Sequence, residues 1–172
     1  MLQERGGDFA CGFGPKVCRD ARHALHALAG VIRKHGAAPI LLGTYQGLPD
    51  ASTEIVRKES AAARDAHVEY ISVSDHLQSG LSRFPREHWF WKDKMHPGHE
   101  LVLLDAVLMY RQVFGTLPAV HSLRVHAAMF VPSTKFFAPE PVSRAIPNGE
   151  YIGYTYTPTS VRHVVQLARI SD

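Results

Sequence analysis

The sequence has few cysteines, no long apolar run and no dense cluster of basic residues, and each absence argues against a class of protein. Its two cysteines, Cys11 and Cys18, do not form a Cys-x-x-Cys pattern, which argues against a zinc ribbon. A disulfide between them and a pair of reduced thiols are both compatible with the sequence. No uninterrupted apolar stretch approaches the roughly 20 residues that span a bilayer. We therefore predict no membrane span.

Charge is balanced, which argues against a nucleic-acid partner. The chain has 19 Lys and Arg against 16 Asp and Glu, for a formal net charge of +3. No run of basic residues is dense enough for a nucleic-acid groove. The first residues lack a charged leader followed by an apolar run, so we predict no signal peptide. The sequence leaves the compartment open, with the cytoplasm as the default.

The 172 residues suffice for one domain with a real core and a small appendage. Helical and strand patterns alternate after a glycine-rich stretch over residues 1–18, which reads as loop. The predicted elements are a helix after an Asp20 cap that ends near Gly36, a strand over 38–43, a helix over 52–66, a strand over 68–73 and a buried helix over 99–113. This alternation predicts an α/β sandwich with a parallel sheet.

The character changes after Gly115. Residues 122–131, 150–157 and 161–170 are rich in Val, Tyr, Phe and Thr, with prolines between them, and indicate strands. The last segment is ambiguous, because Val161, Val164 and Val165 would also line one face of a helix. We therefore predict an α/β domain over residues 1–116 and a β-rich C-terminal extension over 117–172.

The best candidate for a catalytic site is the pair Asp93 and His96, which immediately precedes Pro97 and Gly98. Histidine is the side chain best suited to take a proton from a hydroxyl near neutral pH. A carboxylate that accepts a hydrogen bond from the other ring nitrogen fixes the tautomer and stabilises the imidazolium. Two intervening residues allow a tight loop to fold Asp93 back onto His96.

The motif Asp93-Lys94-Met95-His96-Pro97 resembles the last conserved block of the SGNH (GDSL-type) hydrolases. The resemblance covers about residues 5–115. It implies a flavodoxin-like three-layer α/β/α domain, with this block between the last strand and the last helix. It further implies a serine ester hydrolase of the esterase, lipase or acetylesterase class, with His96 as general base, Asp93 as its partner and no cofactor. The substrate would be a small-molecule ester or an ester on a carbohydrate or lipid.

Two departures from the family pattern limit that resemblance. The family's nucleophile lies in a Gly-Asp-Ser block near the first strand, and the chain has no Gly-Asp-Ser. Gly6-Gly7-Asp8 lies where the family has Gly-x-Asn-Asp, but the asparagine that donates to the oxyanion is missing. The sequence therefore predicts a fragment or nucleophile-lacking form whose N-terminal strands are absent and which is inactive alone. A truncated sheet would need self-association or a partner chain to complete it.

The alternative is a non-catalytic binding or scaffold domain derived from that fold. A metal site formed by Asp93, His96 and His99 is a further alternative. It is disfavoured because Pro97 and Gly98 do not present the two imidazoles on one helical face. His99 fits better as a helix-start residue.

Other polar and aromatic groups have both a functional and a structural interpretation. Trp89, Phe90 and Trp91 line a substrate pocket or, more simply, pack in the core. Residues 44–46 follow a buried strand at the end where α/β sheets bind ligands, and either contact substrate or support the loop. Tyr151, Tyr154 and Tyr156 bind carbohydrate or pack on a sheet. Asp105, within an apolar helix, is expected to cap or pair locally.

Overall fold

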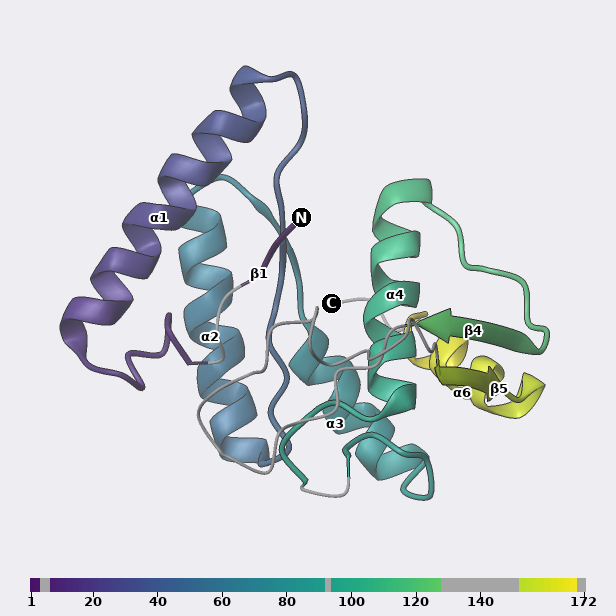
Figure 1. Cartoon of the computed structure of the whole chain (residues 1–172). Helices are drawn as coiled ribbons and strands as arrows, with labels where there is room; N and C mark the ends of the chain where they lie inside the picture. Colours follow the sequence, from purple (N-terminus) through teal and green to yellow (C-terminus); the bar gives the residue numbers. More distant parts are fainter. Residues whose placement is uncertain (4–6, 92–93, 128–151, 170–172) are drawn as a thin grey trace.

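The computed structural model describes residues 1–3, 7–91, 94–127 and 152–169 of the chain. In these ranges it forms a mixed α/β structure around a small parallel sheet of three strands (Figure 1). The strands are β1 (Leu2–Gln3), β2 (Ile40–Leu42) and β3 (Glu69–Ile71), in the order β1-β2-β3. Leu41 of β2 lies opposite Leu2 on one side and Tyr70 on the other. The predicted mixed α/β class with a parallel sheet is confirmed.

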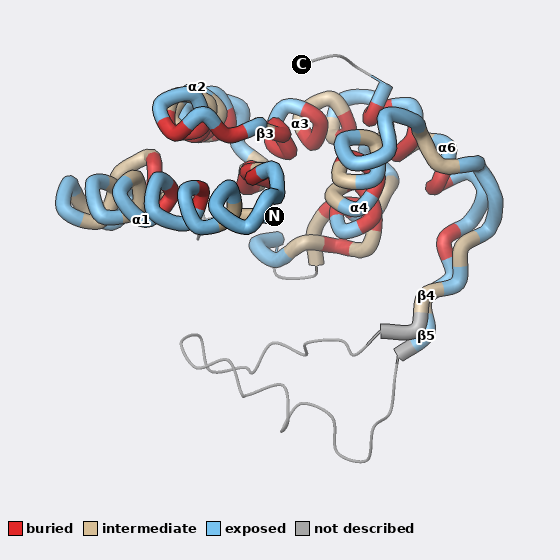
Figure 2. The backbone as a smooth tube through the Cα atoms, turned by 90° about the horizontal axis from the view of Figure 1, so that it is seen from above, coloured by how far each residue is buried: buried red, intermediate tan, exposed pale blue. Residues whose placement is uncertain are grey.

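Successive residues of the strands point to opposite faces of the sheet and so enter two separate hydrophobic clusters. Leu41 and Tyr70 pack with α1 (Pro15–Lys34) and α2 (Pro49–Asp65). Leu42 and Ile71 pack with a cluster built from α3 (Val73–Arg83), α4 (His99–Phe114) and α6 (Pro158–Leu167). Seen from above, α1 and α2 lie to one side and α4 and α6 to the other (Figure 2). The arrangement is compatible with an α/β sandwich.

The N-terminal region is more ordered than the sequence predicts. Residues 1–18 were expected to form a loop, but β1 lies within them and α1 begins at Pro15, a residue whose fixed φ suits the first helical position. Asp20 is inside the helix and not its cap, and it accepts a hydrogen bond from Lys16 Nζ at 2.6 Å. A Cys11–Cys18 disulfide ties the preceding loop to the first turn of α1.

Helix α3 was not predicted, because its polar residues read as part of a long loop. Val73, Leu77 and Gly80 recur at helical spacing and are buried against the larger cluster. Gly80 is required there, since a Cβ on it would lie 2.8 Å from the Trp89 ring. The sequence pattern that would have predicted α3 is therefore this short row of buried positions at helical spacing, one of which is a glycine.

The C-terminal region contains one antiparallel pair of strands and one helix in the residues that are described. Strands β4 (Leu123–Ala127) and β5 (Ile152–Tyr156) pair antiparallel. The sequence left residues 161–170 open between a strand and a helix, and the helix is the correct alternative, because α6 occupies most of that segment. Thr157 caps this helix by accepting a hydrogen bond from Ser160 N–H at 3.1 Å, and Pro158 opens its first turn. The rest of the predicted β-rich extension lies outside the described residues, and the boundary after residue 116 stays a prediction.

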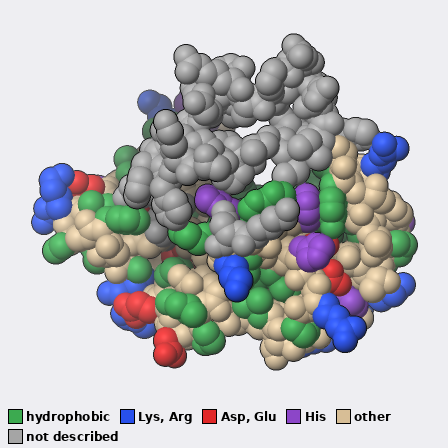
Figure 3. Space-filling view, turned by 60° about the horizontal axis from the view of Figure 1, so that its bottom comes forward, with side chains coloured by type: hydrophobic (Ala, Val, Ile, Leu, Met, Phe, Trp, Pro, Cys, Tyr) green, Lys and Arg blue, Asp and Glu red, His purple; other side chains and the backbone are tan. Residues whose placement is uncertain are grey.

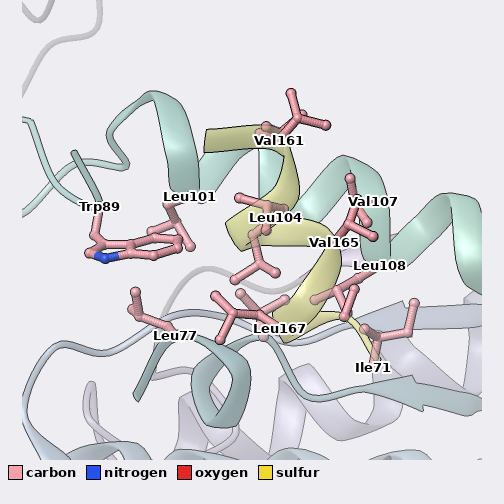
Figure 4. Close-up of a cluster of buried hydrophobic side chains, with 14 of the residues drawn as sticks. Ile71, Leu77, Trp89, Leu101, Leu104, Val107, Leu108, Val161, Val165 and Leu167 are labelled. Atoms are coloured by element: carbon pink, nitrogen blue, oxygen red, sulfur yellow. The ribbon is translucent and has the colours of Figure 1, made fainter. Parts of the chain in front are cut away.

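Helix α6 packs its valines against α4 (Figure 4). Val161, Val164, Val165 and Leu167 are each at most 5% exposed. They fill the space between α4 and α3, together with Trp89 and Leu104. Over the described ranges, no helix has both the length and the apolar character needed to cross a membrane.

Candidate functional site

The candidate site lies at the carboxyl ends of the parallel strands, where three loops meet. Gly43 N–H, just after β2, donates to the carbonyl of Ile71 at the end of β3 at 2.9 Å. Gln78 of α3 donates from Nε2 to the Gln46 carbonyl at 2.6 Å. Tyr45 donates from its hydroxyl to the Met95 carbonyl at 3.1 Å, which brings the loop before α4 to the same edge. Several histidine side chains gather on this face beside hydrophobic ones (Figure 3).

The loop that carries His96 is closed by its own backbone. Trp91 N–H donates to the His96 carbonyl at 2.9 Å, and Gly98 N–H donates to the Trp89 carbonyl at 2.9 Å. Phe90 and Pro97 form an antiparallel bridge between these two bonds. These contacts fix residues 94–98 relative to the start of α4.

Two residues make this closure possible. Trp89 is 2% exposed and donates from its ring nitrogen to the Phe84 carbonyl at 3.0 Å. Its buried ring therefore anchors the start of the loop to the hydrophobic core. At Gly98 a Cβ would lie 1.9 Å from the His88 carbonyl oxygen, so only glycine fits. Of the two interpretations that the sequence allowed, core packing holds for Trp89. Phe90 and Trp91 are only half-buried.

His96 is exposed at this edge, near the partly buried Tyr45. Asp93 lies outside the described residues, so its pairing with His96 stays a prediction. Among the residues that are described, no group of three or more His, Cys, Asp or Glu is arranged to hold a metal ion.

His99 is the first residue of α4, as predicted, and its ring lies in an aromatic cluster. It stacks on Tyr154 with ring centroids 3.6 Å apart and meets the edges of Trp91 and Tyr156. Tyr156 donates from its hydroxyl to the His99 carbonyl at 2.9 Å. Burial lowers the pKa of His99. Tyr154 and Tyr156 therefore pack the β4–β5 strand pair against the start of α4, next to the loop that carries His96. Tyr151 lies outside the described residues.

Glu100 of α4 joins strand β5 to the loop before α4. Its carboxylate is 2% exposed and accepts hydrogen bonds from Tyr154 Oη at 3.3 Å and from His88 N–H at 3.2 Å. A buried carboxylate requires such partners, since an unpaired one is costly. The β4–β5 strand pair and the loop before α4 are therefore both held to the N-terminal end of α4.

A buried carboxylate that the sequence reading missed supports the other loop. Glu59 of α2 is 1% exposed and accepts hydrogen bonds from Thr44 N–H at 2.9 Å, Thr44 Oγ1 at 2.6 Å and Tyr70 Oη at 2.8 Å. Burial and the nearby Glu59 charge raise the pKa of Tyr70 far above its ordinary range. Gly43 leaves room for this carboxylate, because a Cβ there would lie 2.6 Å from Glu59 Oε2.

These contacts settle the role of Thr44, which is 5% exposed and supports the loop structurally. Of residues 44–46, Tyr45 and Gln46 are the partly exposed ones. The burial of Glu59 could have been predicted from its spacing. It lies on the same helical face as Ile55, four residues before it, and as Ala62 and Ala63, three and four residues after it.

Two clusters contain Ser, His and a carboxylate but not in the order of a triad. Ser72 Oγ donates to Asp75 at 2.6 Å, while the 2%-exposed His76 ring contacts the Ser72 carbonyl and not its hydroxyl. In a triad the histidine lies between the serine and the carboxylate. Ser72 therefore lacks the arrangement of an activated nucleophile.

In the second cluster the carboxylate lies in the middle. Glu87 accepts from Ser160 Oγ at 3.1 Å and contacts His163 Nδ1 at 2.7 Å. The His163 ring stacks on Phe84 at 4.0 Å. This cluster joins the loop after α3 to α6, and its serine hydroxyl donates to Glu87 and not to the histidine.

Comparison with known proteins adds no assignment to this geometry. No protein-family model, no curated protein and no solved structure matches the chain at a significant level.

Proposed function

We propose that this chain carries the acid–base loop of an SGNH-type serine ester hydrolase and lacks the nucleophile block. The observation that carries the proposal is the position of His96. It is exposed on a loop closed by backbone hydrogen bonds, next to the carboxyl edge of a parallel sheet and directly before α4. Open α/β sheets bind ligands outside that edge.

The strand order supports the same proposal. A flavodoxin-like sheet has the order 2-1-3-4-5, so its last three strands are consecutive neighbours. The order β1-β2-β3 fits those three positions. In such a sheet, the free side of β1 faces the place of the first strand, which in the SGNH hydrolases is followed by the nucleophilic serine. A parallel strand added there would end at the same edge as the His96 loop.

The proposed chemistry is acyl transfer to water. His96 would take the proton of a serine hydroxyl as that oxygen attacks an ester carbonyl, and would return the proton to the leaving alcohol. It would then take a proton from a water molecule that attacks the acyl-serine, and return it to the serine oxygen as the acid leaves. Asp93 would hold the imidazole in the required tautomer. Tyr45 and Gln46, at the same edge, would contact the acyl or acetyl ester of a lipid or carbohydrate.

The first test concerns the gene. We expect the DNA upstream of the Met1 codon to encode a Gly-Asp-Ser block, in frame or one frame away. A protein that joins this block to the chain should hydrolyse p-nitrophenyl acetate, and His96→Ala should lower kcat by about a thousandfold or more. His88→Ala is the matched control, with little change expected. Full activity in the His96→Ala protein would refute the assignment.

The second test uses the chain as it stands. It should show no hydrolysis of p-nitrophenyl acetate above that of its own His96→Ala variant. Nitrogen-15 NMR of the imidazoles should show one fixed tautomer for His96, which Asp93→Ala releases while His88 is unchanged. An unaltered His96 spectrum in Asp93→Ala would show that the two residues do not interact.

A non-catalytic binding or scaffold domain is the second candidate, favoured by the absence of Gly-Asp-Ser from the chain. It predicts a cooperative thermal unfolding transition without any further segment. It also predicts no esterase activity when upstream sequence is joined. The assay of the joined protein therefore separates the two candidates.

A further inference from the structure

A cavity of about 320 Å³ lies between helices α1 and α2, which run side by side (Figures 1 and 2). Its volume is near the lower end of the range for small-molecule pockets, roughly 300–1,000 Å³. Ala62 and Asp65, in the last turn of α2, line one side. The α1 side is lined by residues at helical spacing on one face: Cys18, Arg19, Arg22, His23 and His26.

The lining of this cavity is basic. Arg19 and Arg22 carry fixed positive charges, and His23 and His26 add two imidazoles of a type that gains a proton near neutral pH. Asp65 is the single carboxylate among the lining residues. Positive groups therefore outnumber negative ones even when both imidazoles are neutral, and the cavity favours an anion.

The sulfur that lines the cavity does not oppose an anion. Cys18 is joined to Cys11 in a disulfide, so it carries no negative charge. The same disulfide holds the loop before α1 to the first turn of the helix. The wall of the cavity at this end is therefore fixed by a covalent bond.

The ion pair between Arg22 and Asp65 leaves Arg22 able to bind a ligand. One guanidinium nitrogen lies 3.3 Å from one carboxylate oxygen. The side chain of Asp65 is 61% exposed and that of Arg22 is 31% exposed, so water screens the pair and it contributes little to stability. A guanidinium has five N–H donors, most of which this contact does not use.

The other basic side chains of the cavity are available as donors. The side chains of Arg19, His23 and His26 make no hydrogen bond or salt bridge to another residue in the described part of the chain. Asp20 lies near Arg19 and His23, but it accepts a hydrogen bond from Lys16 on the outer side of α1. A ligand would therefore meet three basic groups that no carboxylate holds.

We propose that this cavity binds the phosphate group of a small, soluble phosphate monoester. Arginine matches phosphate oxygens with pairs of parallel hydrogen bonds, and imidazolium N–H groups add further charge-assisted donors. A phosphate dianion offers more charge and more acceptors to these donors than a single carboxylate does. Asp65 and Asp20 beside the basic groups disfavour a broad anionic surface, such as a nucleic acid or a membrane, because they would repel it.

The proposed phosphate site is separate from the edge that carries His96. Helix α2 begins at Pro49, just after the loop at that edge, and its 17 residues span roughly 25 Å. Because Asp65 is the last residue of α2, the cavity lies at the far end of this helix. The inference does not rest on the proposed function, since phosphate binding without esterase activity leaves it intact.

Isothermal titration of the chain with glycerol 3-phosphate, at about pH 6 and low salt, tests the proposal. We expect saturable binding of one ligand per chain. Arg19→Gln and His26→Gln should each weaken it about tenfold, because each removes a charge-assisted hydrogen bond. Lys34→Gln and His35→Gln are the matched controls: both residues are exposed at the C-terminal end of the same helix and should leave the affinity unchanged. Far-UV circular dichroism checks that every variant is folded.

NMR of the imidazole rings locates the ligand. The signals of His23 and His26 should move during the titration, while those of His35 stay in place. Sodium acetate at the same concentrations is the anion control and should bind much more weakly. No saturable binding up to about 10 mM would overturn the proposal. So would equal affinity for acetate, equal weakening by Arg19→Gln and Lys34→Gln, or equal movement of the His26 and His35 signals.

Discussion

Asp105 in the middle of α4 should make the protein less stable as the pH rises. Its carboxyl is buried, and Oδ1 has no hydrogen-bond partner among the described residues. The local pairing expected from the sequence is therefore not seen at this oxygen. Burial raises the pKa of Asp105 from 3.8 to about 7. Between these two values the folded chain holds a proton that the unfolded chain has lost.

The sign and size of the effect follow from linkage. Because the native state binds more protons between pH 4 and pH 7, its stability falls as the pH rises through that range and levels off above it. The folded and unfolded pKa values of Asp105 differ by about 3 units. At roughly 1.4 kcal/mol per unit, this difference corresponds to about 4 kcal/mol of stability lost when the carboxyl is ionised. Asp105→Asn keeps the shape and removes the charge. At pH 8 it should stabilise the fold by about 2–4 kcal/mol relative to wild type.

Urea unfolding of wild type and Asp105→Asn at pH 4.5, 6, 7 and 8 gives the measurement. The stability difference should be small at pH 4.5 and should grow through pH 7. Glu69→Gln, at an exposed strand position, removes a carboxylate without burial and should show no such growth. A difference between Asp105→Asn and wild type that is constant with pH would refute the reasoning.

Two further substitutions, each paired with a comparison variant, test the supports of the candidate site. Gly98→Ala should destabilise the protein by about 3 kcal/mol or more, because its Cβ would overlap the His88 carbonyl. Gly30→Ala should have the opposite effect on stability. Nothing lies within 4 Å of a Cβ added at Gly30, and alanine favours the interior of α1, so we expect a stabilisation of about 0.5–1 kcal/mol. Thermal unfolding would show the contrast, and equal shifts would contradict it. Glu59→Gln should cost about 2–3 kcal/mol, because it disrupts a buried carboxylate with three donors. The exposed Glu54→Gln should cost much less, and similar urea midpoints for the two variants would refute this role of Glu59.

The strongest sequence patterns located the centre of the fold correctly. The apolar run around Leu41 and the segment around Tyr70 form the two longer parallel strands, and the apolar helix after Gly98 lies where it was predicted. These signals succeed because a strand buried on both faces and a helix buried against other helices need nearly continuous apolar sequence. The position of the His96 loop before α4 follows from the same pattern.

The parts of the structure that the sequence did not predict have physical explanations. β1 is only two residues long, too short for any periodicity to show. The valines of α6 favour a strand locally, and their burial against α4 overrides that preference. The Glu59 contacts depend on residues 11 and 15 positions away in sequence, whose proximity follows from strand pairing rather than local pattern. Single-sequence reading therefore finds long apolar elements and misses polar groups that only tertiary structure brings together.

The packing of α6 also sets an order of events during synthesis. Leu104 and Leu108 of α4 leave the ribosome about 60 residues before Leu167, which closes the same cluster. At about 5–20 residues per second, this interval lasts roughly 3 to 12 s. During that time a strongly apolar helix has no C-terminal helix against it and offers a binding surface to chaperones. A nascent chain that ends soon after Gly115 would keep that surface permanently and would be a target for degradation.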